Sequence, residues 1–185
     1  MAETAREDWP WTVAEFEDWH ARQPDRWEFV FGAPKMMAPA TMRHSVIKRN
    51  LARLLDRQLE GGPCEVLVDG PQIRTEEISA IPDLVVTCSP LDFSTPVIAE
   101  PAIIIEVMSP SSEADDHGLK MLAYRRIPSL RHDLVVAQHE PLIVVHSRAG
   151  DLWHERFVAE GSIALEGPPL RLELSGVYAS TDLVA

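Results

Sequence analysis

The pattern of apolar positions in the first third of the chain predicts a short helix, a hairpin and a longer helix. A capping-box sequence, Thr12 with Glu15, opens the first helix, which extends to about Gln23. Alternation over residues 26–31 and a Gly/Pro turn before residue 35 indicate the hairpin. The longer helix extends from about residue 41 to 59, with an apolar stripe formed by Ile47, Leu51, Leu54, Leu55 and Leu59.

Shorter apolar runs in the rest of the chain predict strands around one more helix. The expected strands cover residues 64–68, 83–88, 102–108, 133–137, 142–146 and 152–158. The runs at 83–88 and 102–108 are almost continuously apolar, as is typical of central strands covered on both faces. The helix is expected over 113–127, with Leu119, Leu122 and Ala123 facing inward. The predicted fold is α/β, a mixed sheet flanked by helices, with an N-terminal helix and hairpin.

Composition limits the kind of protein that this chain forms. A length of 185 residues with 45% hydrophobic and 25% charged residues fits a single globular domain, residues 1–185. No apolar run approaches the roughly 18 residues of a membrane span, and the N-terminus is polar and acidic rather than a secretory signal. We therefore expect a cytoplasmic protein without membrane association. Cys64 and Cys88 are expected to be small core residues rather than a disulfide.

The net charge of −12 bears on the partners of the protein. Proteins that bind nucleic acid along their whole surface are normally basic, so any phosphate contact here has to be local. A basic helix face and a bound cation could supply that contact. The basic residues of this face are Arg43, Lys48, Arg49, Arg53 and Arg57.

Two carboxylates interrupt apolar strands that have no structural need for them. Asp83 follows Pro82 at the start of one run, and Glu106 follows three isoleucines in the next. Burying a carboxylate costs several kcal/mol unless a partner or a metal neutralises it. Asp83 alone is explained by a turn, whereas a solvated edge position explains Glu106 less well than a functional role does. The pair, however, indicates ligands for a hard divalent cation.

Lys120 lies on the helix predicted after these strands, four residues after Asp116 and four before Tyr124. This spacing fits an ordinary surface ion pair, or a lysine whose stem lies along the sheet and whose ammonium reaches the strand ends. An ammonium group there can stabilise charge that develops on phosphate. The set therefore predicts a metal-dependent phosphodiesterase site. His44, near the start of the longer helix, contacts phosphate or merely packs, and the sequence leaves both interpretations open.

The ordered set of these residues resembles the Uma-type family of putative restriction endonucleases in the PD-(D/E)xK nuclease superfamily. The similarity extends from about residue 10 to 178, and it rests on the order of the motifs because no single motif is specific. The segments that carry it are Trp27-Glu28-Phe29-Val30-Phe31-Gly32, Met37-Ala38-Pro39, His44, Pro82-Asp83, Glu106-Val107-Met108-Ser109-Pro110-Ser111-Ser112, Asp116 with Lys120, Tyr124, Pro128-Ser129-Leu130-Arg131-His132 and Val135-Val136-Ala137.

The resemblance implies a restriction-endonuclease-like core in which Asp83 and Glu106 bind Mg²⁺, with Mn²⁺ as the expected substitute. It also implies that Lys120 assists catalysis and that Glu28 is an additional site carboxylate. For Glu28, the sequence alone allows a solvated position in an alternating strand. We expect the carboxylates of Asp83 and Glu106 to lie about 4–6 Å apart, close enough to share one cation.

Two further residues complete the expected site. The resemblance makes His44 and Tyr124 candidate substrate contacts. In the wider superfamily the lysine stands two residues after the second acid, where this chain has Met108. The family resemblance places the lysine on the following helix instead, as Lys120. No P-loop, nucleophile elbow or dinucleotide fingerprint is present in the sequence, so no organic cofactor is expected.

The leading hypothesis is a Mg²⁺-dependent endonuclease that hydrolyses DNA phosphodiester bonds. Intact Asp83, Glu106 and Lys120 favour it. A catalytically silent nuclease fold that serves as a binding or assembly module remains open, as does a hydrolase of another phosphoester. We also expect a homodimer, because nucleases of this fold commonly need two active sites for two strands. The strands between residues 133 and 158 are apolar enough to supply a pairing edge.

Overall fold

A computed structural model describes residues 11–108 and 114–183 of the chain, and the side chains of 114–117 lie outside the described part. The helices are α1 (Val13–His20), α2 (Met42–Leu59), α3 (Ala114–Tyr124) and α4 (Leu174–Val177). The strands are β1 (Trp27–Val30), β2 (Ala33–Met36), β3 (Glu65–Val68), β4 (Ile73–Arg74), β5 (Ile78–Ala80), β6 (Leu84–Thr87), β7 (Pro101–Met108), β8 (His132–Ala137), β9 (Ile143–Ala149), β10 (Leu152–Val158), β11 (Ser162–Leu165) and β12 (Leu170–Glu173).

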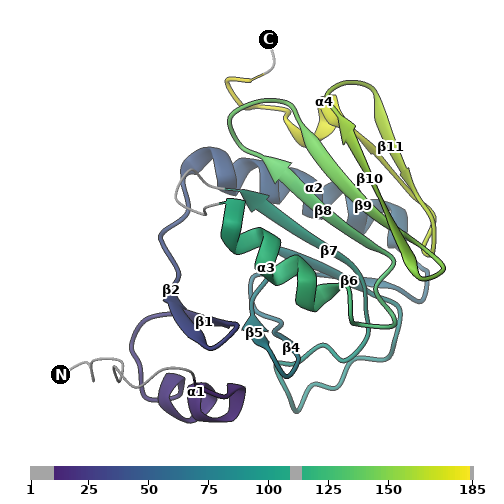
Figure 1. The fold of residues 1–185 in the computed structure, drawn as a ribbon. Helices are drawn as coiled ribbons and strands as arrows, with labels where there is room; N and C mark the ends of the chain where they lie inside the picture. Colours follow the sequence, from purple (N-terminus) through teal and green to yellow (C-terminus); the bar gives the residue numbers. More distant parts are fainter. Residues whose placement is uncertain (1–10, 109–113, 184–185) are drawn as a thin grey trace.

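A six-stranded mixed sheet forms the centre of the molecule, in the order β10-β9-β8-β7-β6-β3. Neighbouring strands of this sheet pair antiparallel except β7 and β8, which are parallel. Parallel neighbours need a crossover connection, and α3 lies in that connection. Figure 1 shows α3 across one face of the sheet and α2 behind the other. The predicted mixed sheet flanked by helices is confirmed.

The predicted N-terminal helix and hairpin form a smaller unit beside the main sheet. β1 and β2 are an antiparallel pair inside a second sheet of order β2-β1-β5-β4. Phe31 and Gly32 make the turn with φ values of 45° and 88°, a conformation that suits a two-residue hairpin turn. The capping box of Thr12 and Glu15 is present at α1. Phe16 of α1 packs on Phe29 of β1, with ring centroids 5.3 Å apart.

Two hydrophobic cores cover the two faces of the main sheet. Alternate residues of β7, Ile103, Ile105 and Val107, face the core that is shared with α2, α4, β11 and β12. Ile104 faces a second core, which contains Val30 of β1, Ala123 and Tyr124 of α3. Glu106 has the same parity as Ile104, so the strand directs it toward the α3 side of the sheet. The near-continuous apolar run is thereby explained, because β7 is covered on both faces.

The expectation that Cys64 and Cys88 are separate core residues is wrong, because the structure joins them in a disulfide. β3 and β6 pair with Glu65 opposite Thr87, so the next residues outward, Cys64 and Cys88, stand opposite each other. Their Cα atoms are 3.9 Å apart. The bond links the outer strand β3 to β6, the strand that follows Asp83. The pairing depends on strand register, which the separate sequence positions do not reveal.

The inward orientation expected for Leu119 and Leu122 is also wrong. Their exposed fractions are 39% and 50%, whereas Lys120, Ala123 and Tyr124 are buried. The sheet-facing side of α3 is therefore polar at Lys120 and at the hydroxyl of Tyr124, because the helix covers a polar site rather than a purely apolar surface. Within the described residues, no helix is both long and apolar enough to cross a membrane.

Candidate active site

A cavity of about 990 Å³ lies between the β1–β2 hairpin, the start of α2, the ends of β6 and β7, and α3. It brings together residues from distant parts of the sequence. The predicted site residues that line it are Glu28, His44, Asp83, Glu106 and Lys120. The predicted convergence of the two acids and the lysine is therefore present in the fold.

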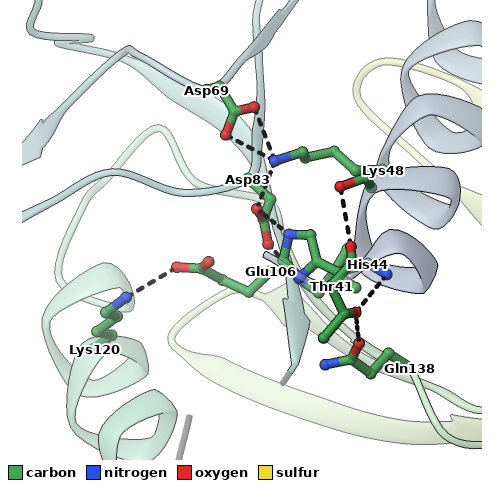
Figure 2. Close-up of polar contacts among 10 residues, drawn as sticks. Thr41, His44, Lys48, Asp69, Asp83, Glu106, Lys120 and Gln138 are labelled. Atoms are coloured by element: carbon green, nitrogen blue, oxygen red, sulfur yellow. Dashed lines mark hydrogen bonds and ion pairs between the residues drawn. The ribbon is translucent and has the colours of Figure 1, made fainter. Parts of the chain in front are cut away.

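Asp83 and Glu106 reach the cavity because of the register between β6 and β7. Leu84 is paired with Ile105 in this antiparallel ladder, so Asp83 lies one step further along, opposite Glu106. Residues directly opposite each other in such a ladder point to the same face. Oδ2 of Asp83 accepts the backbone N–H of Val107 at 2.8 Å, which fixes the carboxylate at the strand end. Figure 2 shows the carboxylate of Glu106 directed toward Lys120 and that of Asp83 directed toward His44. The separation of 4–6 Å stays a prediction.

Glu106 is held from the α3 side by two side chains. The hydroxyl of Tyr124 donates a hydrogen bond to Oε1 of Glu106 at 3.1 Å, and Nζ of Lys120 lies 3.6 Å from the same oxygen. Burial, with the charges of Glu106, Glu28 and Asp133, raises the pKa of Tyr124 well above its ordinary value. The phenol therefore keeps its proton and remains a donor to Glu106. Figure 2 shows Lys120 approaching Glu106 from α3.

Glu28 belongs to the same network. Its Oε2 lies 2.6 Å from Nζ of Lys120, and its Oε1 accepts the backbone N–H of Ile81 at 2.8 Å. Glu28 and Lys120 are both buried, so this is a desolvated ion pair rather than a surface contact. The solvated position that the sequence allowed for Glu28 is not found. The N-terminal hairpin thus contributes a carboxylate to the wall of the cavity.

His44 stands on the opposite side of Asp83. Thr41 caps α2 by accepting the N–H of His44 at 3.1 Å, which places the imidazole in the first turn, over the end of β6. Nε2 of His44 donates to Oδ1 of Asp83 at 2.8 Å. Burial by itself would raise the pKa of Asp83, but the hydrogen bond and charge of His44, the N–H of Val107 and the charge of Lys48 outweigh it. The pKa of Asp83 is lowered, and the group stays ionised at neutral pH.

Lys48 and Asp69 also line the cavity, although the sequence pattern assigned Lys48 to a basic helix face. Nζ of Lys48 lies 2.8 Å from Asp69 and 3.4 Å from Oδ1 of Asp83. Lys48 is one helical turn after His44, so both side chains leave α2 toward the same carboxylate. The four-residue spacing of His44 and Lys48 is the sequence feature that could have indicated a place for Lys48 in the site. The other arginines of the basic face, Arg49, Arg53 and Arg57, are exposed.

The placement of Tyr124 does not fit the expected substrate contact. The side chain is fully buried among the residues of the second core, so it lies behind Glu106. Tyr124 is better described as a residue that positions this carboxylate. The side chain of Asp116, together with residues Ser109 to Ser112 of the family motif, lies outside the described residues.

The donor set fits a hard divalent cation that completes its shell with water and substrate. Among residues 11–108 and 118–183, no three side chains of His, Cys, Asp or Glu stand together as a ready ligand set. Mg²⁺ does not require one, because it is commonly held by one or two carboxylates and keeps several waters or phosphate oxygens. Asp83 and Glu106 provide two such carboxylates on one wall of the cavity. Each of these acids also has a lysine nearby, Lys48 beside Asp83 and Lys120 beside Glu106.

Comparison with known proteins gives a consistent result. The sequence model of the Uma2 family, described as "Putative restriction endonuclease", matches residues 13–179. The uncharacterized protein slr1290 of Synechocystis is 32% identical over 169 residues, which cover 90% of this chain and 85% of that protein. A second Synechocystis protein, the uncharacterized sll1609, is 27% identical over 145 residues, or 76% of this chain and 82% of its own length.

A solved structure has the same fold. It is the crystal structure of a putative nuclease belonging to DUF820 from Anabaena variabilis, with a TM-score of 0.75 and 14% sequence identity. The similarity covers 92% of this chain and 98% of that one. At this identity the likeness establishes the shared nuclease-like architecture. The activity of the site has to be argued from its residues.

Proposed function

Because this chain belongs to the Uma2 family of putative restriction endonucleases, we propose that it is an endonuclease that hydrolyses DNA phosphodiester bonds with Mg²⁺, or with Mn²⁺ as a substitute. The observation that carries the proposal is the convergence of Asp83, Glu106 and Lys120 on one cavity. These residues come from two strands and a helix, and folding alone gives no reason to gather their charges there.

Asp83 and Glu106 are the residues that would hold the cation. When bound, a divalent cation polarises the phosphate and makes a nearby water more acidic. The N–H of Val107 and the hydroxyl of Tyr124 orient the two carboxylates before any ligand arrives. Such preorganisation matters because a ligand that has to rearrange its own site loses part of its binding energy.

Lys120 is the residue proposed to act on the reacting phosphate. Its ammonium is buried at the cavity wall between Glu28 and Glu106. Its position is therefore fixed, and solvent screens its charge only weakly. A fixed positive charge in a water-poor site stabilises the extra negative charge of the phosphoryl transition state. Glu28 holds this ammonium in position. His44, which holds Asp83, is the proposed contact to a neighbouring phosphate oxygen.

Metal binding and cleavage by matched variants test this proposal. We expect Mn²⁺ to bind the wild-type chain and weakly specific nicking of plasmid DNA to depend on added Mg²⁺ or Mn²⁺ and stop with EDTA. Glu106→Gln should abolish cleavage, because it removes a ligand charge while keeping the shape, and Asp83→Ala should lose metal binding. Arg53→Met, an exposed change on α2, is the control for altered charge. Cleavage by Glu106→Gln at the wild-type rate would show that the activity comes from another site or a contaminant.

One observation favours a second candidate, a catalytically silent binding or assembly module. Each acid at the centre of the cavity already has a protein cation beside it, with Lys48 near Asp83 and Lys120 near Glu28. Such a closed set of ion pairs is stable without a metal. Absence of both Mn²⁺ binding and cleavage, over single- and double-stranded substrates, would favour this module over the nuclease.

A further inference from the structure

We propose that Lys48 is a built-in cation of this site and that it limits the cavity to one divalent ion per chain. The proposal rests on the metal-dependent function argued above and adds the number of ions that the site takes. In this proposal the ammonium of Lys48 occupies the position where a second ion would otherwise bind, between Asp69 and Asp83.

The contacts of Lys48 resemble those of a bound cation. Its Nζ is 2.8 Å from each carboxylate oxygen of Asp69 and 3.4 Å from Oδ1 of Asp83. The side chains of Lys48 and Asp83 are only 13% and 14% exposed, so this pair is largely removed from solvent. An ordinary surface ion pair would leave the lysine free to sample other positions in water. Here Lys48 lines the cavity wall, and its ammonium lies between Asp83 and Asp69, whose side chain is 45% exposed.

Asp83 borders both the Lys48–Asp69 pair and the proposed metal position beside Glu106. Figure 2 shows Asp83 between Asp69 on one side and Glu106 on the other. Two-metal phosphodiesterases hold their ions about 3.5–4 Å apart, usually across a shared carboxylate. In this chain Asp83 and Glu106 both line the cavity, whereas Lys48 lies between Asp83 and Asp69. A divalent ion beside a fixed ammonium is strongly disfavoured, because both carry positive charge.

A lysine in this position also contributes to the reaction. Its ammonium is a compact point charge with three donors, and it can contact a phosphate oxygen from the side opposite Lys120. The scissile phosphate would then meet one metal ion and two ammonium groups, with the extra negative charge shared among them. Lys48 thereby supplies the charge of a second cation without the need to recruit one.

The number of bound Mn²⁺ ions tests the inference independently of cleavage. Titration of the full chain, followed by the electron paramagnetic resonance of free Mn²⁺, should give one bound ion per chain for the wild type. Lys48→Met, which keeps the stem and removes the charge, should give two. Lys48→Arg, which keeps the positive charge, should bind one ion per chain. The double variant Lys48→Met/Asp69→Asn should also give one, because the second ion loses a ligand.

Arg53→Met controls for the loss of one positive charge on the same helix, and it should bind one ion. If Lys48→Met does not fold, as judged by circular dichroism, Lys48→Gln takes its place with the same expected count. One ion in both wild type and the folded Lys48 variant would overturn the inference and leave the nuclease proposal intact. Two ions in the wild type would also overturn it. No bound ion in any of these proteins would instead overturn the metal-dependent function itself, and this inference with it.

Discussion

Two lysines from different helices approach the acids of the cavity from opposite sides. Lys120 of α3 contacts Glu28 and lies near Glu106, while Lys48 of α2 contacts Asp69 and lies near Asp83. Both lysine side chains are largely removed from solvent. Their consequences for chemistry differ, because Lys120 faces the open part of the cavity beside Glu106 and Lys48 fills the space beyond Asp83.

Lys120→Met should separate catalysis from metal binding. We expect the cleavage rate to fall by about 10²- to 10³-fold, the usual effect of removing one group that stabilises transition-state charge. Mn²⁺ affinity should change little, because an ammonium does not ligate a cation. Single-turnover cleavage together with Mn²⁺ titration measures both quantities, and Arg57→Met on the exposed face of α2 is the control. An equal loss of rate in both variants would contradict a specific role for Lys120.

The sequence allowed the main acids of the site to be predicted, but not the residues that hold them. Asp83 and Glu106 stood out because a carboxylate within an apolar strand needs an explanation. Lys48 did not stand out, because a lysine on a helix with several arginines is normally solvated. Its position over Asp83 follows from how α2 crosses the end of β6, and local sequence contains no information about that crossing.

At the scale of elements, an arginine from β9 caps the segment that follows α3. The guanidinium of Arg148 donates to the backbone carbonyls of Arg125 and Ile127 at 2.6 and 2.9 Å and to that of Leu130 at 2.8 Å. It also lies over the ring of Trp153, 4.7 Å from the centroid. These carbonyls lie just past the end of α3, and Arg148 gives them a partner within the protein.

Arg148→Met should therefore destabilise the protein by about 2–3 kcal/mol, since hydrogen bonds to a charged group are among the stronger ones. It should also slow cleavage, because α3 carries Lys120. Urea denaturation measures the free energy of unfolding. Arg156→Met on β10, where the side chain is exposed, is the matched control and should cost less than about 0.5 kcal/mol. Equal stability of the two variants would contradict the capping role.

The regular elements were predicted where their periodicity is long, and less well where it is short. The apolar stripe of α2 and the continuous run of β7 are confirmed. The three-residue strand β5 was not predicted, because it is too short to show a pattern of its own. The helix α3 was predicted, but its buried face was not. The amphipathic pattern favoured Leu119 and Leu122, and the site required Lys120 on that face.

At the scale of the whole molecule, two buried histidines should give stability opposite dependences on pH. Burial by itself would lower the pKa of His146, but hydrogen bonds and charge from Asp133 and Glu155 outweigh it and raise the pKa above 6.5. Burial lowers the pKa of His132 below 6.5. A histidine whose pKa is raised in the folded state stabilises the fold at pH values below its unfolded pKa. This contribution is lost as the pH rises through the folded pKa.

His146→Gln should therefore cost more stability at about pH 6 than at about pH 9. The sign is reversed for His132. A histidine whose pKa is lowered in the folded state costs stability at pH values where the unfolded histidine is protonated. His132→Gln should cost less at acidic pH than at neutral pH. Urea denaturation of both variants across this range measures the difference. The same pH trend in the two variants would contradict the assignment of opposite shifts.

The homodimer expected from the sequence stays a prediction. β10 is an edge strand of the main sheet, and its Leu152 and Phe157 are both 67% exposed. Apolar side chains on an unpaired edge can bind a second copy of the chain. Light scattering should give a dimer mass for the wild type and a monomer mass for Phe157→Asp. A monomer mass for the wild type across a wide concentration range would contradict the prediction.

All residues that line the cavity lie between Pro24 and Lys120 in the chain, and this order has a consequence for synthesis. The ribosome has therefore synthesised all of the cavity-lining residues before it makes β8. The core beneath those groups, however, includes Leu134, Val136 and Leu172, which arrive later. A nascent chain that ends after Lys120 has the reactive groups without the packed support that fixes their positions. We therefore expect a nascent chain to gain the proposed activity only after these later strands have been added, and until then its apolar strands need protection from aggregation.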